Sequence, residues 1–318
     1  MKEGFAIGID LGGTNLKVGV VDSSGRVAVS RSVPVGQDRS ARGIVAQIIE
    51  EAARLRREAP GPVIALGCGV PGIVDFEKGI VYSSPNLPEW GDVPVRELLL
   101  KGTGLPVALD NDANMYALGE CRFGAGRGHR NMVLLTLGTG IGGGIVLNGE
   151  VFHGDDGFAG EVGHLVVEPE GISCGCGGRG CWERYAASRG FQVHAERLEK
   201  KEREALLAAA GTDLAGLTPE LMAKLAGSGN KIAIELWGTL GRYLGIGIAT
   251  LLNILGVYTF VVGGGIARSM DLFAGSAKRE ALAHTYPRHE ASLSIIRAAL
   301  GDNAGIVGAA TEALAMAK

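Results

Sequence analysis

The sequence predicts an α/β protein with two related domains that face each other across a cleft. Its 318 residues exceed one ordinary hydrophobic core, and strand and helix patterns alternate along them. Residues 5–33 show the order strand, glycine turn, strand, turn and strand, and residues 131–152 repeat the first part of that order. When the two stretches are aligned, Thr136 falls on Asp10. We interpret this match as an internal duplication, which implies two facing domains.

The elements of the first half follow from apolar periodicity and from the turns between apolar runs. Helical spacing of apolar residues predicts a helix, and short apolar runs that end at turns such as GVPG predict strands. An acid such as Asp112 is favourable in the first turn of a helix. After the opening meander we expect a helix at 41–58, strands at 63–68 and 106–110 with a strand pair near 73–83 between them, and a helix at 112–121.

The second half contains an uncharged segment, from Tyr243 to Ile266, that is long enough to cross a bilayer. Glycines interrupt this segment and its character changes midway. It reads as a buried helix that ends at Gly256 and is followed by the strand VYTFVV, so we expect a core element rather than a membrane span. A last helix, at about 303–317, is expected to cross back and pack on the first domain.

We place the domain boundary near the strand end at residues 110–112. Residues 1–111 and 302–318 would form a smaller N-terminal α/β domain that the last helix closes. Residues 112–301 would form the larger α/β domain.

Composition and charge exclude several classes of partner. Hydrophobic residues make up 46% of the chain and charged residues 20%, as in a well-buried soluble protein. The formal net charge of −3 provides no electrostatic basis for binding nucleic acid or an anionic membrane. The opening MKEGFAIGID lacks the regions of a secretory signal. We therefore expect a cytoplasmic protein with neither nucleic-acid nor membrane partners.

One histidine and three cysteines lie close together in the stretch GHLVVEPEGISCGCGGRGCWE. They are His164, Cys174, Cys176 and Cys181, and two acids, Glu161 and Glu183, bracket them. One imidazole and three thiolates complete a tetrahedral zinc site and leave no position for a reactive water. Because only five cysteines occur in a chain expected to be cytosolic, a structural zinc site in the larger domain is favoured over disulfides or chance clustering.

The remaining cysteines and histidines show no ligand-like spacing. Cys68 and Cys121 are isolated, and we interpret them as small buried apolar residues. The other histidines are interpreted as surface residues or as satisfied core residues; these are His129, His153, His194, His284 and His289.

Glycine is unusually frequent, at 52 residues, and three glycine-rich turns each follow an apolar strand. These turns are DLGGTN at 10–15, LGTG at 137–140 and VVGGGIA at 261–267. Glycine lets backbone N–H groups approach phosphate oxygens without a Cβ in the way. None of the turns matches a Walker loop or a convincing dinucleotide fingerprint. A tight hairpin would explain any one of them, but three in a duplicated α/β framework indicate phosphate binding.

These features together resemble the ROK family of sugar kinases and repressors, within the actin-like, hexokinase and heat-shock ATPase superfamily. The similarity covers nearly the whole chain, through DLGGTNLKVGVVD, NDANMYALGE, LGTGIGGGIVLNGEVFHG and CGCGGRGCWE. The cysteine motif is specific to the family, and together with SPNLPEW it is most similar to the bacterial glucokinases. The resemblance implies the actin-like, ribonuclease H-like fold and ATP-dependent phosphorylation of a hexose, glucose above all, at its 6-hydroxyl. It also implies Mg²⁺ and a structural Zn²⁺.

The resemblance implies a role for each matching position. Asp10 would hold Mg²⁺, largely through water, and Lys17 is the nearest cation, although its strand could equally turn it to solvent. The ATP phosphates would be received by Gly12, Gly13, Thr14, Asn15, Gly138, Thr139 and Gly140, and the adenosine would be bordered by Gly263, Gly264 and Gly265. The sugar would be lined by Asn111, Asp112, Glu161, His164 and Glu183, joined by Gly72 and Asn86.

Asp112, in LDNDAN, is the candidate base for the sugar hydroxyl. An alcohol resembles water at a pKa of ~15.7 and an aspartate has ~3.9, so the proton has to move late, in a loose transition state. Positioning and charge neutralisation would then carry most of the catalysis. A purely structural Asp112, as a helix cap or first-turn acid, is the alternative, and Asp110 could take that structural place instead.

The zinc is expected to act indirectly. It would orient His164, whose second ring nitrogen is then available to the sugar, and hold Glu161 and Glu183 around the same ring. Carboxylates suit this place because each accepts two hydroxyl hydrogen bonds.

Other functions within the family stay open at this point. The repressors carry a DNA-binding winged helix before the kinase-like core, whereas here the first strand begins at about residue 5. Kinases for N-acetylglucosamine, N-acetylmannosamine, mannose, fructose or allose share the framework, and single hydroxyls decide between these sugars. Polyphosphate is an alternative donor. Relatives are usually dimers or tetramers, so a homo-oligomer is expected.

Overall fold

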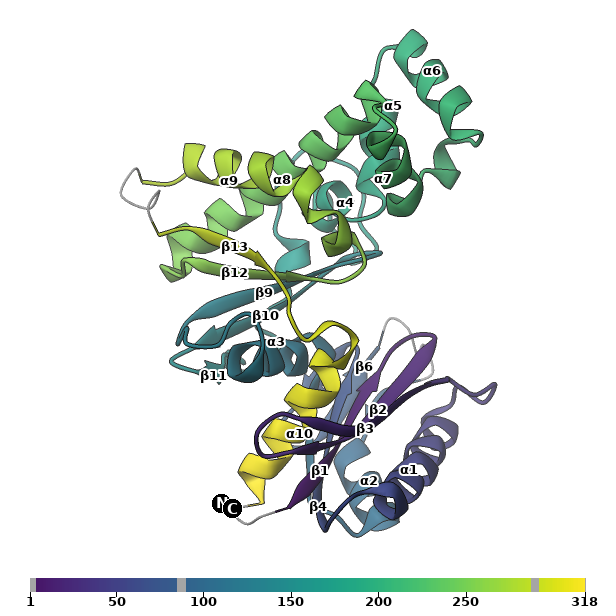
Figure 1. Cartoon of the computed structure of the whole chain (residues 1–318), viewed down its shortest axis with the longest axis vertical. Helices are drawn as coiled ribbons and strands as arrows, with labels where there is room; N and C mark the ends of the chain where they lie inside the picture. The colour runs from purple at the N-terminus through teal and green to yellow at the C-terminus, as the bar shows by residue number, and fades with distance from the viewer. Residues whose placement is uncertain (1–3, 85–89, 287–291, 318) are drawn as a thin grey trace. The chain divides into compact units, whose positions relative to one another are not determined.

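The protein is described by a computed structural model for residues 4–84, 90–286 and 292–317 (Figure 1). The chain divides into two compact units. The first comprises Met1–Leu134, Gly144–Gly160 and Ala298–Lys318, and the second comprises Leu135–Gly143 and Glu161–Arg297.

A five-stranded sheet forms the centre of the first unit, in the order β3-β2-β1-β4-β8. Strands β1 (Phe5–Leu11), β2 (Asn15–Asp22) and β3 (Val27–Pro34) pair antiparallel, which confirms the meander expected from the sequence. Strands β4 (Val63–Val70) and β8 (Val107–Asn111) continue the sheet in parallel with β1. The carboxyl ends of β1 and β8 therefore meet at one edge of the sheet, and these ends carry Asp10 and Asn111.

Helices cover both faces of this sheet, because its strands carry buried apolar residues on both sides. Helices α1 (Ala41–Glu58) and α2 (Val95–Thr103) pack against one core, which includes Ile7, Ile9 and Leu66. Helix α10 (Ala304–Met316) packs against the other face through Ile306 and Val307, and α3 (Asp112–Phe123) packs on α10 (Figure 1).

Glycines let the backbone of α10 lie directly on the sheet. A Cβ on Gly8 would lie 1.9 Å from the carbonyl oxygen of Ile306, and one on Gly67 would lie 1.8 Å from that of Ala309. Only a glycine at these two strand positions leaves room for the helix backbone. This close approach brings the first turn of α10 next to the end of β1.

The second sheet repeats the order of the first, as β11-β10-β9-β12-β13. Its strands are β9 (Met132–Leu137), β10 (Ile141–Leu147), β11 (Glu150–Val151), β12 (Thr259–Gly263) and β13 (Ser294–Arg297). Again the second and third strands in the chain pair antiparallel, and the last two pair in parallel. The repeated order agrees with the duplication inferred from the glycine turns.

The uncharged segment of the second half is a core helix followed by a strand, as predicted. Helix α8 (Lys231–Leu255) ends at Gly256, whose φ of 63° is left-handed, and β12 follows. In the described part of the chain α8 is the one helix whose length and apolar composition would allow it to cross a membrane. It packs on α9 (Ala274–Ala283), and half of its most apolar window is buried in the protein.

The remaining elements are short. A three-stranded antiparallel sheet of the first unit consists of β5 (Ile73–Asp75), β6 (Ile80–Ser83) and β7 (Gly91–Val93). The second unit adds α4 (Glu183–Ala186), α5 (Gly190–Glu196), α6 (Lys200–Ala210) and α7 (Pro219–Gly227). Single 3₁₀ turns are η1 (Val162–His164), η2 (Leu214–Gly216) and η5 (Gly301–Asn303), and η3 (Ile266–Leu272) is a longer 3₁₀ segment with a kink at Ser269.

The compact units and the predicted domains divide the chain at different residues. Helix α3 belongs to the first unit because it crosses α10 closely: a Cβ on Gly308 would lie 1.6 Å from the carbonyl oxygen of Met115. The predicted domains, residues 1–111 with 302–318 and residues 112–301, rest on the positions of the motifs in the sequence. The division into compact units does not test them, so they stay a prediction.

Candidate functional site

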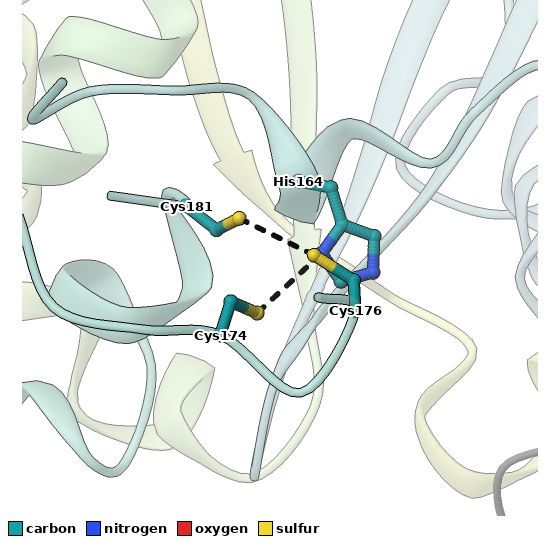
Figure 2. A group of neighbouring side chains, drawn as sticks. All are labelled: His164, Cys174, Cys176 and Cys181. Atoms are coloured by element: carbon teal, nitrogen blue, oxygen red, sulfur yellow. Dashed lines mark hydrogen bonds between the residues drawn. The ribbon is translucent and has the colours of Figure 1, made fainter. Parts of the chain in front are cut away.

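The cysteine-rich loop brings four possible metal ligands together. One donor atom from each of His164, Cys174, Cys176 and Cys181 lies within 4.8 Å of all the others. The Sγ atoms of Cys176 and Cys181 are 3.6 Å apart, and Cys174 Sγ is 3.8 Å from His164 Nδ1. Tetrahedral zinc, with bonds of about 2.3 Å to sulfur and about 2.1 Å to nitrogen, requires ligand separations of about 3.5–3.8 Å. Figure 2 shows the thiols and the imidazole turned toward one another, and this donor set fits such an ion.

The backbone of the loop holds this arrangement. The N–H of Cys174 donates to the carbonyl of Gly178 at 2.8 Å, and an isolated bridge pairs Val166 with Cys181. Gly180 has a φ of 69°, and a Cβ there would lie 1.7 Å from the carbonyl oxygen of Glu168, so the turn requires glycine. The glycine before Cys181 therefore has a local structural reason.

Two of the three thiols are buried, and burial disfavours their thiolate forms. Burial raises the pKa of the Cys181 thiol to about 12 and also raises the pKa of the Cys174 thiol. The exposed Cys176 has a lowered pKa, chiefly because the backbone N–H of Gly178 faces its sulfur. A divalent cation among these sulfurs would favour deprotonation of all three.

The structure brings the two bracketing acids to the same cluster. Glu161 Oε2 lies 3.9 Å from Nε2 of His164, the ring nitrogen opposite the one that faces Cys174. The Cys174 thiol lies 3.2 Å from Glu183 Oε1. A Cβ on Gly140 would lie 2.3 Å from Glu183 Oε2, so this carboxylate rests against the turn at 137–140. Acids, imidazole and glycine turn therefore lie together in the second unit.

The second and third glycine turns meet at neighbouring strand ends of that unit. Gly264 has a φ of 83°, and a Cβ there would lie 2.3 Å from the carbonyl oxygen of Leu137, the last residue of β9. Gly138 is held from the other side by Ser188, whose hydroxyl donates to its carbonyl at 2.8 Å. The predicted positions 138–140 and 263–265 thus lie close to each other.

In the first unit, Asp10 lies where a helix begins and beside a lysine. A Cβ on Gly305, in the first turn of α10, would lie 2.7 Å from Asp10 Cγ. The Lys17 ammonium is 4.0 Å from Asp10 Oδ2 and 3.1 Å from Asp302 Oδ1. Burial raises the pKa of Asp10, and the positive charge of Lys17 opposes this shift. Lys17 is therefore turned toward the acids rather than away from them.

The first glycine turn closes between β1 and β2 beside Asp10. The N–H of Gly12 donates to the carbonyl of Asn15 at 2.9 Å, and the residues of the turn are partly exposed. The Arg39 guanidinium donates to the carbonyl of Gly13. Sequence reasoning did not single out Arg39, because a lone arginine in a loop carries no motif.

Asn111 and Asp112 stand at the junction of β8 and α3. Asn111 is the N-cap of α3: its Oδ1 accepts the N–H of Ala113 at 2.8 Å, and its Nδ2 donates to the carbonyl of Gly72 at 3.0 Å. Asp112 Oδ1 accepts the same Ala113 N–H at 2.9 Å. The capping role thus belongs to Asn111, which also holds Gly72 next to the turn. The predicted Asn86 lies outside the described residues.

His153 is a partly buried histidine that lies beside this turn. Its Nε2 lies 2.7 Å from Oδ2 of Asp110, and its ring stacks on Phe76 with centroids 3.7 Å apart. The contact with Asp110, 43 residues away in the chain, is consistent with the interpretation of His153 as a satisfied histidine. Such a contact leaves no trace in local spacing.

Comparisons with known proteins agree with this geometry. A model of the ROK family matches residues 6–316. The chain is 36% identical over 316 residues to a glucokinase from Streptomyces coelicolor, and the match covers 96% of each protein. A glucokinase from Thermotoga maritima is 36% identical over 309 residues, again with 96% of each protein covered.

A crystal structure shows the same fold. The ROK family glucokinase from Streptomyces griseus, in complex with glucose and AMPPNP, has a TM-score of 0.81 and 34% identity. The superposition covers 98% of this chain and 100% of that one. The actin-like ATPase fold expected from the sequence is therefore confirmed.

Regulators are also related to this chain. A xylose repressor from Bacillus subtilis is 28% identical over 309 residues, which are 96% of this chain and 76% of the repressor. A family match over nearly the full length, together with curated relatives above 30% identity, decides the assignment. This chain belongs to the ROK family.

Proposed function

We propose that this protein is an ATP-dependent sugar kinase that phosphorylates glucose at the 6-hydroxyl. Its similarity along the full length to glucokinases is the observation that carries the proposal. The site geometry supports it, because glycine turns at strand ends suit phosphates and clustered carboxylates suit a polyol. Hexose and ATP are the small-molecule partners.

The first unit supplies the groups proposed for the reacting end of ATP. The turn at 12–15 presents backbone N–H groups to phosphate, and Asp10 would hold Mg²⁺ at the start of α10. When bound, this ion neutralises charge on the phosphoryl oxygens. Lys17 is oriented toward the same acids and so adds a positive charge beside them. In the second unit, the turns at 138–140 and 263–265 would receive the remaining phosphates and the adenosine.

Asp112 is the proposed base. The carboxylate at the start of α3 would accept the proton of the 6-hydroxyl late in the transfer, as the new P–O bond forms. Asn111 already caps the helix, so Asp112 is not needed for that purpose. Asn111, with Gly72 beside it, and Asn86, which lies outside the described residues, are the further sugar-lining residues proposed for the first unit.

Zinc is the ion proposed for the Cys₃His cluster. The ligand separations fit its tetrahedral geometry, and the four ligands leave no open position, which makes the site structural. The loop would hold Glu161, His164 and Glu183 for the sugar hydroxyls. The metal takes part in no chemical step.

A coupled assay tests the proposed function. We expect ATP with glucose to give ADP and glucose 6-phosphate, and we expect the rate to exceed that with N-acetylglucosamine, N-acetylmannosamine, mannose, fructose or allose. The same assay with polyphosphate in place of ATP tests which of the two is the phosphoryl donor. Phosphorylation of an acetylated sugar but of no hexose would reject glucose as the substrate.

Two further experiments test the remaining proposals. Light scattering on the same sample tests the proposed dimer or tetramer, and fractionation of the cells tests the proposed cytoplasmic location.

A further inference from the structure

We propose that His153 is a positioning residue for phosphoryl transfer, acting through Asp110 on the turn that presents Asn111 and Asp112. The inference rests on the proposed kinase function, in which Asp112 accepts the proton of the sugar hydroxyl. His153 does not need to touch the substrate in this role. It sets the place of the residues that do.

The contact between His153 and Asp110 is short and shielded from solvent. His153 Nε2 donates to Asp110 Oδ2 at 2.7 Å, and the two side chains are only 18% and 8% exposed. A hydrogen bond to a carboxylate is strong when little water competes for it. Truncating the imidazole would leave a buried carboxylate oxygen without this donor, which is costly.

The other oxygen of Asp110 holds the turn itself. Asp110 Oδ1 accepts the backbone N–H of Asn111 at 2.7 Å and the amide Nδ2 of Asn114 at 3.0 Å. Asn111 and Asn114 lie on either side of Asp112 in the chain. A rotation of the Asp110 carboxylate would therefore move the backbone before and after the proposed base.

The imidazole is itself held in one orientation. Its ring stacks on Phe76 with centroids 3.7 Å apart and an interplanar angle of 15°. Phe76 directly follows β5, and β5 packs against β8, the strand that ends in Asn111. Phe76, His153 and Asp110 thus form a relay of three side chains that reaches the start of α3.

The size of the effect follows from the geometry of proton acceptance. A shift of about 1 Å in a catalytic group can cost on the order of 10²-fold in rate. None of the three relay residues belongs to a predicted phosphate turn, so binding of ATP is expected to change little. The signature of a positioning role is thus a fall in kcat with an unchanged KM for ATP.

Two substitutions at His153 separate positioning from bulk packing. His153→Leu removes the donor and keeps an apolar side chain on Phe76, whereas His153→Gln keeps an N–H near the place of Nε2. We expect His153→Leu to lower kcat by about 10- to 100-fold with KM for ATP within about twofold of wild type. His153→Gln should recover most of the loss. His284→Leu, which removes a half-exposed histidine 3.1 Å from Glu280, serves as the matched control with unchanged kcat.

A structural measurement tests the relay without any turnover. In His153→Leu the backbone amides of residues 111–114 should exchange with deuterium faster than in wild type, while amides of α1 keep their rates. A wild-type protein that fails to phosphorylate glucose would count against the proposed function and leave this measurement valid. Unchanged exchange at 111–114 would overturn the inference.

The kinetic outcomes are equally decisive. An unchanged kcat in His153→Leu overturns the proposal, and so do equal losses in the Leu and Gln variants together with a lowered melting temperature. If His153→Leu does not fold, His153→Ala replaces it, and Asp110→Asn, His153→Ala and their double variant are compared. Because the two residues act as one unit, the second change should add less than twofold to the loss. Losses that multiply would contradict the relay.

Discussion

At the residue scale, three aspartates of the first unit have different environments, and these suggest different roles. Asp10 lies at the first turn of α10 beside Lys17, which suits a carboxylate that stays charged near a cation. Asp110 is buried, and both of its oxygens are used inside the protein. Asp112 follows the residue that caps α3, and its Oδ1 accepts the Ala113 N–H that Asn111 Oδ1 also accepts.

Replacing Asp112 with asparagine tests its role as the base. Asp112→Asn keeps an oxygen for the N–H of Ala113 and should keep glucose affinity, but kcat should fall by about 10²–10⁴-fold, since the proton acceptor is lost. Calorimetry with glucose and the coupled assay measure the two quantities. Glu97→Gln, at the corresponding first turn of α2, is the control and should leave kcat unchanged. Turnover near the wild-type rate in Asp112→Asn would remove Asp112 from the base role.

At the element scale, the cysteine-rich loop has little regular structure and is organised around its ligands. Its two isolated bridges and its glycine turns give it a fixed path, and Trp182 anchors its end through a hydrogen bond from Nε1 to the carbonyl of Tyr243 at 2.7 Å. A loop of this kind gains much of its stability from a bound metal. The two acids proposed to bind the sugar lie at its two ends, so we expect the metal site and the sugar site to be coupled.

Loss of the metal should therefore weaken the sugar site before the nucleotide site. We expect one zinc per chain by mass spectrometry, and none in Cys176→Ser. Glucose affinity should fall at least tenfold in that variant, whereas ATP affinity should change by less than about threefold. Cys121→Ser changes a buried thiol outside the cluster and should keep its zinc. Full activity in a protein shown to be free of zinc would contradict the coupling.

At the scale of the whole molecule, a repeated sheet order and a close-packed last helix organise the chain. Both sheets combine antiparallel and parallel strand pairs, and the turns at 12–15 and 138–140 follow the corresponding strands, β1 and β9. In the first unit, α10 rests on the sheet through Gly8 and Gly67, which ties the end of the chain to its beginning. The protein gains its stability from these buried cores. Because His194 is buried among them, we expect the stability to depend on pH.

His194 should make the protein less stable in mild acid. It is 3% exposed, its Nε2 lies 2.8 Å from the carbonyl oxygen of Tyr185, and burial lowers its pKa to about 4. Since the unfolded value is about 6.5, the unfolded state binds the proton first. The contribution of neutral His194 to the free energy of unfolding is complete above pH ~6.5 and is lost as the pH falls toward 4. The loss is on the order of 3 kcal/mol.

Urea unfolding at several pH values measures this dependence. The free energy of unfolding of wild type should fall more steeply between pH 6.5 and 4.5 than that of His194→Gln, which keeps a donor for Tyr185 but does not titrate. Carboxylates and metal ligands contribute equally to both proteins, so the difference between the curves isolates His194. Parallel curves would show that His194 is not buried in its neutral form.

Much of the fold was accessible from the sequence because it depends on local patterns. Alternating apolar residues and the turn SSG predicted the opening meander, which the structure confirms. Gly256 was predicted to end the apolar helix, and it is the residue that follows the last residue of α8. The cluster of His164 with Cys174, Cys176 and Cys181 was readable because its ligands lie within one loop. The capping role at α3 was less clear, since Asp110, Asn111 and Asp112 all suit a helix start and only hydrogen-bond geometry chooses Asn111.

The sequence by itself determined the family, the glycine turns and the cluster of one histidine with three cysteines, because each of these depends on residues close together along the chain. The tertiary structure alone decided that Lys17 faces Asp10 and Asp302, and that His153 donates to Asp110. These contacts join segments far apart in sequence, and neither hydrophobic period nor motif spacing encodes which distant side chain will arrive. The packing of the sheet, α3 and α10 brings these distant side chains together. The proposed positioning of Asp112 depends on the same packing.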